Sequence, residues 1–84
     1  MTFIKRLISK AELEVVMTVK ELIGVFDDWN IPVVINDSNL KQLAKCHNIA
    51  IFVRNKYNVL GCDRSNAEVV AFGLYDGELA IRIS

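Results

Sequence analysis

Few side chains of this chain have the types and spacing that catalysis requires. The only histidine is His47, and its neighbour Cys46 would point about 100° away from it on a helix, so the two cannot form a nucleophile and base locally. Asp27 and Asp28 are adjacent, but the sequence supplies no further oxygen ligands that would complete a cation site. Asp37 follows a strand-like run, where an aspartate most often caps a helix. The glycines match neither a phosphate-binding loop nor a dinucleotide fingerprint. We therefore predict no catalytic residue, no metal ligand and no cofactor.

Basic and aromatic side chains gather in residues 54–64, and these could recognise a partner. The candidate residues are Arg54, Lys56, Tyr57 and Arg64. Cations beside an aromatic ring can hold phosphates and stack a base, which makes weak nucleic-acid binding one interpretation. They can equally pair with an acidic protein surface, including an acidic block on another copy of the chain. That block comprises Glu12, Glu14, Glu21, Asp27 and Asp28. We favour the protein partner and keep nucleic acid as the alternative.

The charge balance supports that preference. The formal net charge is zero, so the field of the whole protein does not attract nucleic acid. The charges are nevertheless segregated, with bases predominating in residues 1–10 and 38–64 and acids in residues 11–37 and 65–84. Such segregation favours contact between complementary surfaces of two molecules.

The apolar content is high for a chain of 84 residues, which we expect to form one domain over 1–84. Hydrophobic residues make up 52% of the chain, and a domain of this size buries only ~60% of its unfolded surface. The surplus predicts a homo-oligomer or a partner interface. The longest apolar runs, 31–35 and 49–53, are far shorter than the ~18 residues that cross a bilayer, and the N-terminal residues fit no signal peptide, so we expect a cytoplasmic protein without membrane contact.

A long helix is predicted near the N-terminus. Ser9 and Glu12 have capping-box spacing, which predicts a helix over residues 10–29. The main apolar arc of that helix comprises Val15, Val16, Val19, Leu22, Ile23, Phe26 and Trp29. Leu13 and Met17 lie outside the arc with Gly24 between them in angle, and a mid-helix glycine often marks close approach of another backbone. This ridge is a second candidate partner surface, although the N-terminal segment could also cover Leu13 and Met17.

The middle of the chain predicts a βαβ unit. The β-branched residues 33–35 indicate a strand, residues 36–39 offer helix caps, and a short helix would run through Cys46. Asn48 would end that helix, and the apolar residues 49–53 would form a second strand parallel to the first.

The C-terminal residues predict a β-hairpin around Asp76-Gly77, a type I′ turn signal. Pairing outward from this turn matches Leu74 with Leu79, Phe72 with Ile81 and Val70 with Ile83. A second capping box, Ser65 to Glu68, leaves a helix over residues 66–74 as the alternative.

Together these patterns predict an α+β fold: a long N-terminal helix, a short βαβ unit and a C-terminal β-hairpin, forming a small mixed sheet with helices packed on one face. The expected function is a non-catalytic, protein-binding regulator or inhibitor that forms homo-oligomers. Small domains without motifs of this kind are common among phage and mobile-element accessory proteins.

Overall fold

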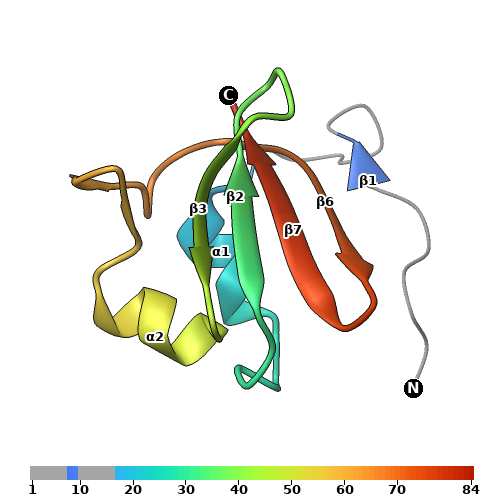
Figure 1. The fold of residues 1–84 in the computed structure, drawn as a ribbon, viewed down its shortest axis with the longest axis vertical. Helices are drawn as coiled ribbons and strands as arrows, with labels where there is room; N and C mark the ends of the chain where they lie inside the picture. The colour runs from blue at the N-terminus through green and yellow to red at the C-terminus, as the bar shows by residue number, and fades with distance from the viewer. Residues whose placement is uncertain (1–7, 10–16) are drawn as a thin grey trace.

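The computed structural model describes residues 8–9 and 17–84, and their main feature is a mixed β-sheet with strand order β1-β6-β7-β2-β3 (Figure 1). The elements in chain order are β1 (Ile8–Ser9), α1 (Val19–Gly24), β2 (Val33–Asn36), β3 (Gln42–Cys46), α2 (Ile49–Arg54), β4 (Asn58–Val59), β5 (Cys62–Asp63), β6 (Val69–Tyr75) and β7 (Glu78–Ile83). Strands β4 and β5 form a separate two-stranded ribbon.

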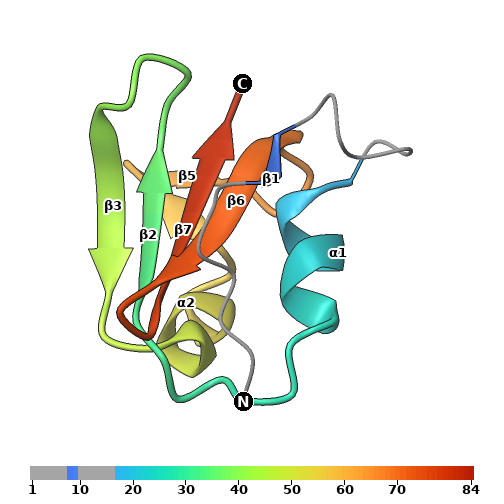
Figure 2. The same ribbon diagram turned by 90° about the vertical axis from the view of Figure 1, so that its right-hand side faces the viewer.

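Two hairpins, one parallel pairing and the antiparallel pairing of the short β1 with β6 build the sheet. Strands β2 and β3 are antiparallel neighbours, as are β6 and β7. Strand β7 then pairs with β2 in parallel, with Val33 opposite Leu79 and Ile35 opposite Ile81. The two hairpins therefore meet at the centre of the sheet, and α1 lies beside the sheet when it is viewed from the side (Figure 2).

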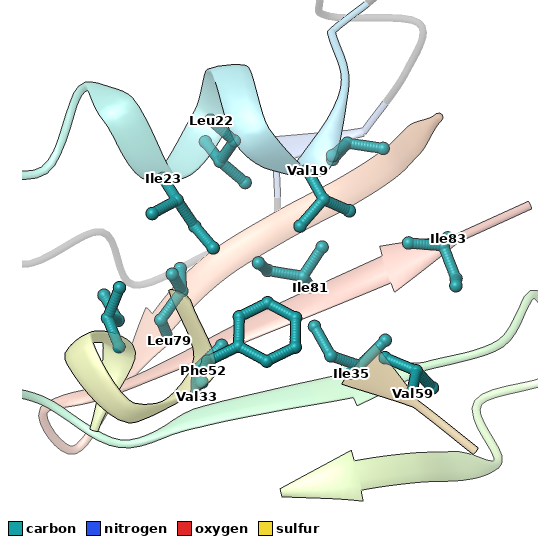
Figure 3. Close-up of a cluster of buried hydrophobic side chains, with 12 residues drawn as sticks. Val19, Leu22, Ile23, Val33, Ile35, Phe52, Val59, Leu79, Ile81 and Ile83 are labelled. Carbon is teal, nitrogen blue, oxygen red and sulfur yellow. The ribbon is translucent and has the colours of Figure 1, made fainter. Parts of the chain in front are cut away.

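The hydrophobic core lies between one face of the sheet and the two helices. Figure 3 shows the α1 side chains pointing toward those of β7, with the ring of Phe52 from α2 among them. The buried cluster comprises Val19, Leu22, Ile23, Val33, Ile35, Ile49, Phe52, Val59, Val69, Leu79, Ile81 and Ile83. Both apolar runs of the sequence contribute to this cluster, with Val33 and Ile35 from β2 and Ile49 and Phe52 from α2.

The predicted helix over residues 10–29 is wrong. Ser9 lies in β1 opposite Ala71, and the helix that forms runs only from Val19 to Gly24. Its capping box is Thr18 with Glu21: Thr18 Oγ1 accepts from the Glu21 amide at 3.2 Å, and Glu21 Oε1 accepts from the Thr18 amide at 3.0 Å. The capping box that begins this helix is thus nine residues later than the predicted one, and it places the buried Val19 in the first turn. Residues 10–16, including Leu13, lie outside the described residues.

The predicted βαβ unit is also wrong, because the helix and the second strand are exchanged. Asp37 turns the chain back on itself: its Oδ1 accepts from the amides of Asn39 and Lys41 at 2.8 and 2.9 Å. Strand β3 follows where a helix was expected. Asn48 begins a helix instead of ending one, because its Oδ1 accepts from the Ile51 amide at 2.8 Å. The apolar residues that follow form α2, and the parallel partner of β2 is β7.

The C-terminal hairpin prediction is confirmed. Leu74 pairs with Leu79 and Phe72 with Ile81, and both central turn residues have positive φ. The register shifts between residues 69 and 71, so Ile83 lies opposite Val69 and not opposite residue 70 as predicted. The alternative helix over 66–74 does not form.

Candidate functional site

An open pocket lies at the C-terminal end of α2, and it contains part of the predicted basic cluster. Its volume is about 480 Å³, and the described residues that line it are Cys46, Arg54, Asn55, Lys56 and Asn58. We call this the α2 pocket. Two cations, two amides and one thiol line it, and no carboxylate occurs among these residues. The arrangement can bind a negatively charged or hydrogen-bond-accepting group.

The backbone at the end of α2 presents Arg54 and Lys56 to this pocket. The Lys56 amide donates to the Val53 carbonyl, and the Tyr57 amide donates to the Phe52 carbonyl, both at 2.9 Å. This bond pair defines a Schellman motif, with Lys56 in the left-handed conformation at φ 59°. This motif therefore fixes the direction of the Lys56 side chain relative to the helix.

Tyr57 belongs to the packing of this helix end. Its ring meets that of Phe52 edge to face, with centroids 5.5 Å apart and an interplanar angle of 82°. Such a contact between the second residue after the C-cap and the last helical turn commonly accompanies a Schellman motif. Tyr57 is packed against the core cluster, so its ring does not stand free beside the basic side chains.

Arg64 is brought next to this helix end through its backbone, because its amide donates to the Tyr57 carbonyl at 2.9 Å. An acidic group also stands in this region. The pKa of Asp63 is lowered by hydrogen bonds from the Ser65 backbone and side chain, with smaller contributions from the charges of Lys20 and Lys56. The basic cluster is therefore partly neutralised on the side of β5.

The ribbon of β4 and β5 adds an apolar feature beside the α2 pocket. Leu60 and Gly61 form its turn with φ of 53° and 82°, and Asn58 Oδ1 accepts from the Gly61 amide at 3.1 Å. Asn58 thus joins the turn to the pocket lining. The side chain of Leu60 is 72% exposed. The left-handed backbone conformation is unfavourable for leucine, and the exposed side chain of Leu60 gains no burial within the chain to offset that cost. We therefore treat Leu60 as a candidate contact residue.

The second predicted surface is not assembled as expected. Met17 packs against the core cluster, and its carbonyl accepts from the Val69 amide at 2.8 Å. Gly24 is the last residue of α1 and is exposed, and a Cβ added to it would meet no atom within 4 Å. Leu13 lies outside the described residues.

Cys46, His47 and the acidic side chains are the described groups that could take part in catalysis or hold a metal ion. Burial raises the pKa of the Cys46 thiol, which disfavours the nucleophilic thiolate. His47 is exposed on the turn before α2. Across residues 8–9 and 17–84, no group of three or more His, Cys, Asp or Glu side chains could hold a metal ion. Neither described helix has the length and apolar character to cross a bilayer.

Comparison with known proteins gives no relative: no family model matches the chain, and no match was found among curated proteins or among solved structures.

Sequence reasoning did not anticipate the contributions of Cys46, Asn55, Asn58 and Leu60. The signal for the turn was present, since Asn58 stands three residues before Gly61 and can accept from its amide. Cys46 could not be placed in the pocket, because β3 was expected to be a helix.

Proposed function

We propose that this protein acts by binding protein, as a non-catalytic regulator or inhibitor, and that the α2 pocket receives an acidic surface of a second copy of the chain. The observation that carries the proposal is the pocket itself: Arg54 and Lys56 stand beside Asn55 and Asn58 with no carboxylate among the described lining residues. These side chains supply several hydrogen-bond donors that carboxylates of a partner can accept.

The same chain carries a surface of complementary charge. Glu21, Asp27 and Asp28 are exposed on α1 and the segment after it. Two apolar side chains stand among them, Val25 at 66% and Trp29 at 38% exposure. We call residues 21–29 the acidic segment. Acidic and apolar groups on this segment match basic and apolar groups, Leu60 included, around the α2 pocket.

Two features favour a protein partner over nucleic acid. The ring of Tyr57 contacts Phe52 and packs against the core cluster, so less of it is exposed for stacking on a base than on a fully exposed side chain. Neutral overall charge points the same way.

Self-association of the purified chain tests the proposal. Sedimentation velocity from micromolar to millimolar concentration should give a mass that rises above 9.5 kDa with concentration and falls back as salt screens the charges. Replacing Arg54→Glu and Lys56→Glu together, or Asp27→Lys and Asp28→Lys together, should abolish association. A mixture of the two variants should associate again, because each retains the surface that the other lacks.

Lys41→Glu is the matched control, since Lys41 is an exposed cation in the turn between β2 and β3. That variant should associate like the original chain. A mass that stays at 9.5 kDa at every concentration would overturn the proposal. Salt-sensitive binding of a single-stranded DNA oligonucleotide that is lost with Arg54→Glu and Lys56→Glu, without self-association, would establish the nucleic-acid alternative.

A further inference from the structure

A second pocket lies on the face of the sheet opposite the core. Its volume is about 190 Å³, and the described residues that line it are Asn36, Leu40, Tyr75, Ala80 and Arg82. Because Leu79, Ile81 and Ile83 of β7 point into the core, the alternate residues Ala80 and Arg82 point to the other face. We call this the outer-face pocket.

The strand register brings the polar residues of the pocket together. Arg82 lies opposite Asn36 on the parallel neighbour β2, so the guanidinium and the amide start from paired positions. Tyr75 lies on β6, and its ring extends over Gly73: a Cβ added to Gly73 would come within 3.1 to 3.3 Å of ring atoms and the hydroxyl of Tyr75. The absence of a side chain at Gly73 therefore lets the phenol lie along the sheet toward the pocket.

One nitrogen of the half-buried Arg82 side chain has no hydrogen-bond partner. Its Nε is buried and makes no hydrogen bond, and no carboxylate of the described residues forms an ion pair with it. On the same face, Lys45 Nζ lies 3.3 Å from Glu78 Oε2, so that cation has its carboxylate. A buried donor on a charged group is costly when unpaired. The same side chain lines the pocket, where the remaining donors of its guanidinium can pair with an anion.

The turn that leads into β3 supplies an apolar rim to the pocket. Leu40 has a φ of 67°, a left-handed conformation that a branched side chain rarely adopts, and it is 63% exposed. The Asp37 carboxylate fixes this turn through the amides of Asn39 and Lys41. An exposed leucine held in this conformation beside the pocket offers an apolar contact to a ligand.

We propose that the outer-face pocket binds the carboxylate of a small organic acid, with the guanidinium of Arg82 pairing the carboxylate. Asn36 and Tyr75 supply neutral hydrogen-bond donors, and Leu40 and Ala80 contact the apolar part of the acid. A single cation among neutral donors matches a monoanion better than a dianionic phosphate. The volume of about 190 Å³ lies below the ~300–1,000 Å³ of pockets for drug-sized ligands, so the acid is small.

The test is an NMR titration of the full chain in which the arginine Nε–H signals are followed. Benzoate is the probe, and benzamide and inorganic phosphate are the comparison compounds. Benzoate should shift the Arg82 signal in a saturable way, whereas benzamide, which carries no charge, should not shift it. Phosphate should bind more weakly than benzoate.

Variants locate the site. Arg82→Met should weaken benzoate binding about tenfold or more, since it removes charge-assisted hydrogen bonds, and Tyr75→Phe should weaken it a few-fold. Lys20→Met is the control, since Lys20 is an exposed cation on α1 that lines neither pocket, and this variant should bind benzoate normally. An unchanged Arg82 signal, equal shifts at all arginines, or equal effects of benzamide and benzoate would each overturn the proposal. The titration of the unmodified chain decides the matter even where Arg82→Met fails to fold.

Discussion

Two hairpin turns of this protein have nearly the same backbone and very different side chains. Asp76 and Gly77 join β6 to β7 with φ of 51° and 76°, and Leu60 and Gly61 join β4 to β5 with φ of 53° and 82°. Positive φ at both central residues is what a type I′ turn requires. Aspartate tolerates the left-handed region, whereas leucine is disfavoured there.

The β6–β7 turn joins two strands that are buried in the core, whereas the β4–β5 turn exposes an apolar side chain. Strands β6 and β7 are long and bury Leu79 and Ile81 in the core. The ribbon of β4 and β5 has only two residue pairs, and its Leu60 projects outward. A conformational cost that no burial within the chain offsets is consistent with a contact role for Leu60.

The largest expected effect is a difference in the free energy of unfolding between two variants, each of which replaces one leucine in one of the two hairpins. Leu79→Ala should lower the free energy of unfolding by about 2–5 kcal/mol, because Leu79 is fully buried and its removal leaves a cavity. Leu60→Ala should change it by less than about 0.5 kcal/mol, because that side chain is exposed. Urea unfolding followed by circular dichroism measures both. Similar losses for the two variants would show that the ribbon turn is part of the core.

A smaller effect should reveal the strain at Leu60. Leu60→Asn should raise the free energy of unfolding by about 0.5–1 kcal/mol, because asparagine adopts the left-handed conformation more readily. Asp76→Asn is the control and should be nearly neutral, since both residues suit that position. Under the proposed function the same Leu60→Asn variant should self-associate less in sedimentation velocity. A free energy of unfolding equal to or below that of the original chain would show that the backbone of Leu60 is not strained.

The smallest expected effect on the free energy of unfolding comes from the ionisation of Asp63 in β5. The pKa of Asp63 is lowered from its ordinary value of 3.8, chiefly by hydrogen bonds from Ser65. A lowered folded-state pKa contributes stability that is present above the unfolded value and lost as pH falls through the folded value. The original chain should therefore lose stability below about pH 4 more steeply than Asp63→Asn does.

Urea unfolding measured from pH 6 down to pH 2 checks this prediction. The asparagine can still accept from the Ser65 amide, which isolates the ionisation from the turn geometry. Parallel stability curves for the two chains over this range would contradict it.

The C-terminal hairpin was predictable because everything that determines it is local. The Asp76-Gly77 turn sets the register, and alternation along the two strands sets which side chains face the core. Only the shift between residues 69 and 71 escaped prediction, since a bulge depends on the partners on both sides of the strand.

The middle of the chain was not predictable in this way. Residues 49–53 are apolar at every position, and a short run of that kind suits a buried helix as well as a strand. Asparagine can either begin or end a helix, so Asn48 did not decide between the two. The choice depends on where Ile49 and Phe52 reach the core, which only the assembled sheet specifies.

By itself, the sequence determined the features that rest on neighbouring residues: the C-terminal hairpin, strand β2 and the basic cluster at residues 54–64. The tertiary structure decided which capping signal begins the first helix, which of two segments becomes β3 and which becomes α2, and which side chains share a pocket. The α2 pocket joins Cys46 to Arg54, and the outer-face pocket joins Asn36 to Arg82. The physical reason is that short segments of this chain have nearly balanced local preferences, so the free energy gained by burial against distant strands determines which conformation each segment adopts.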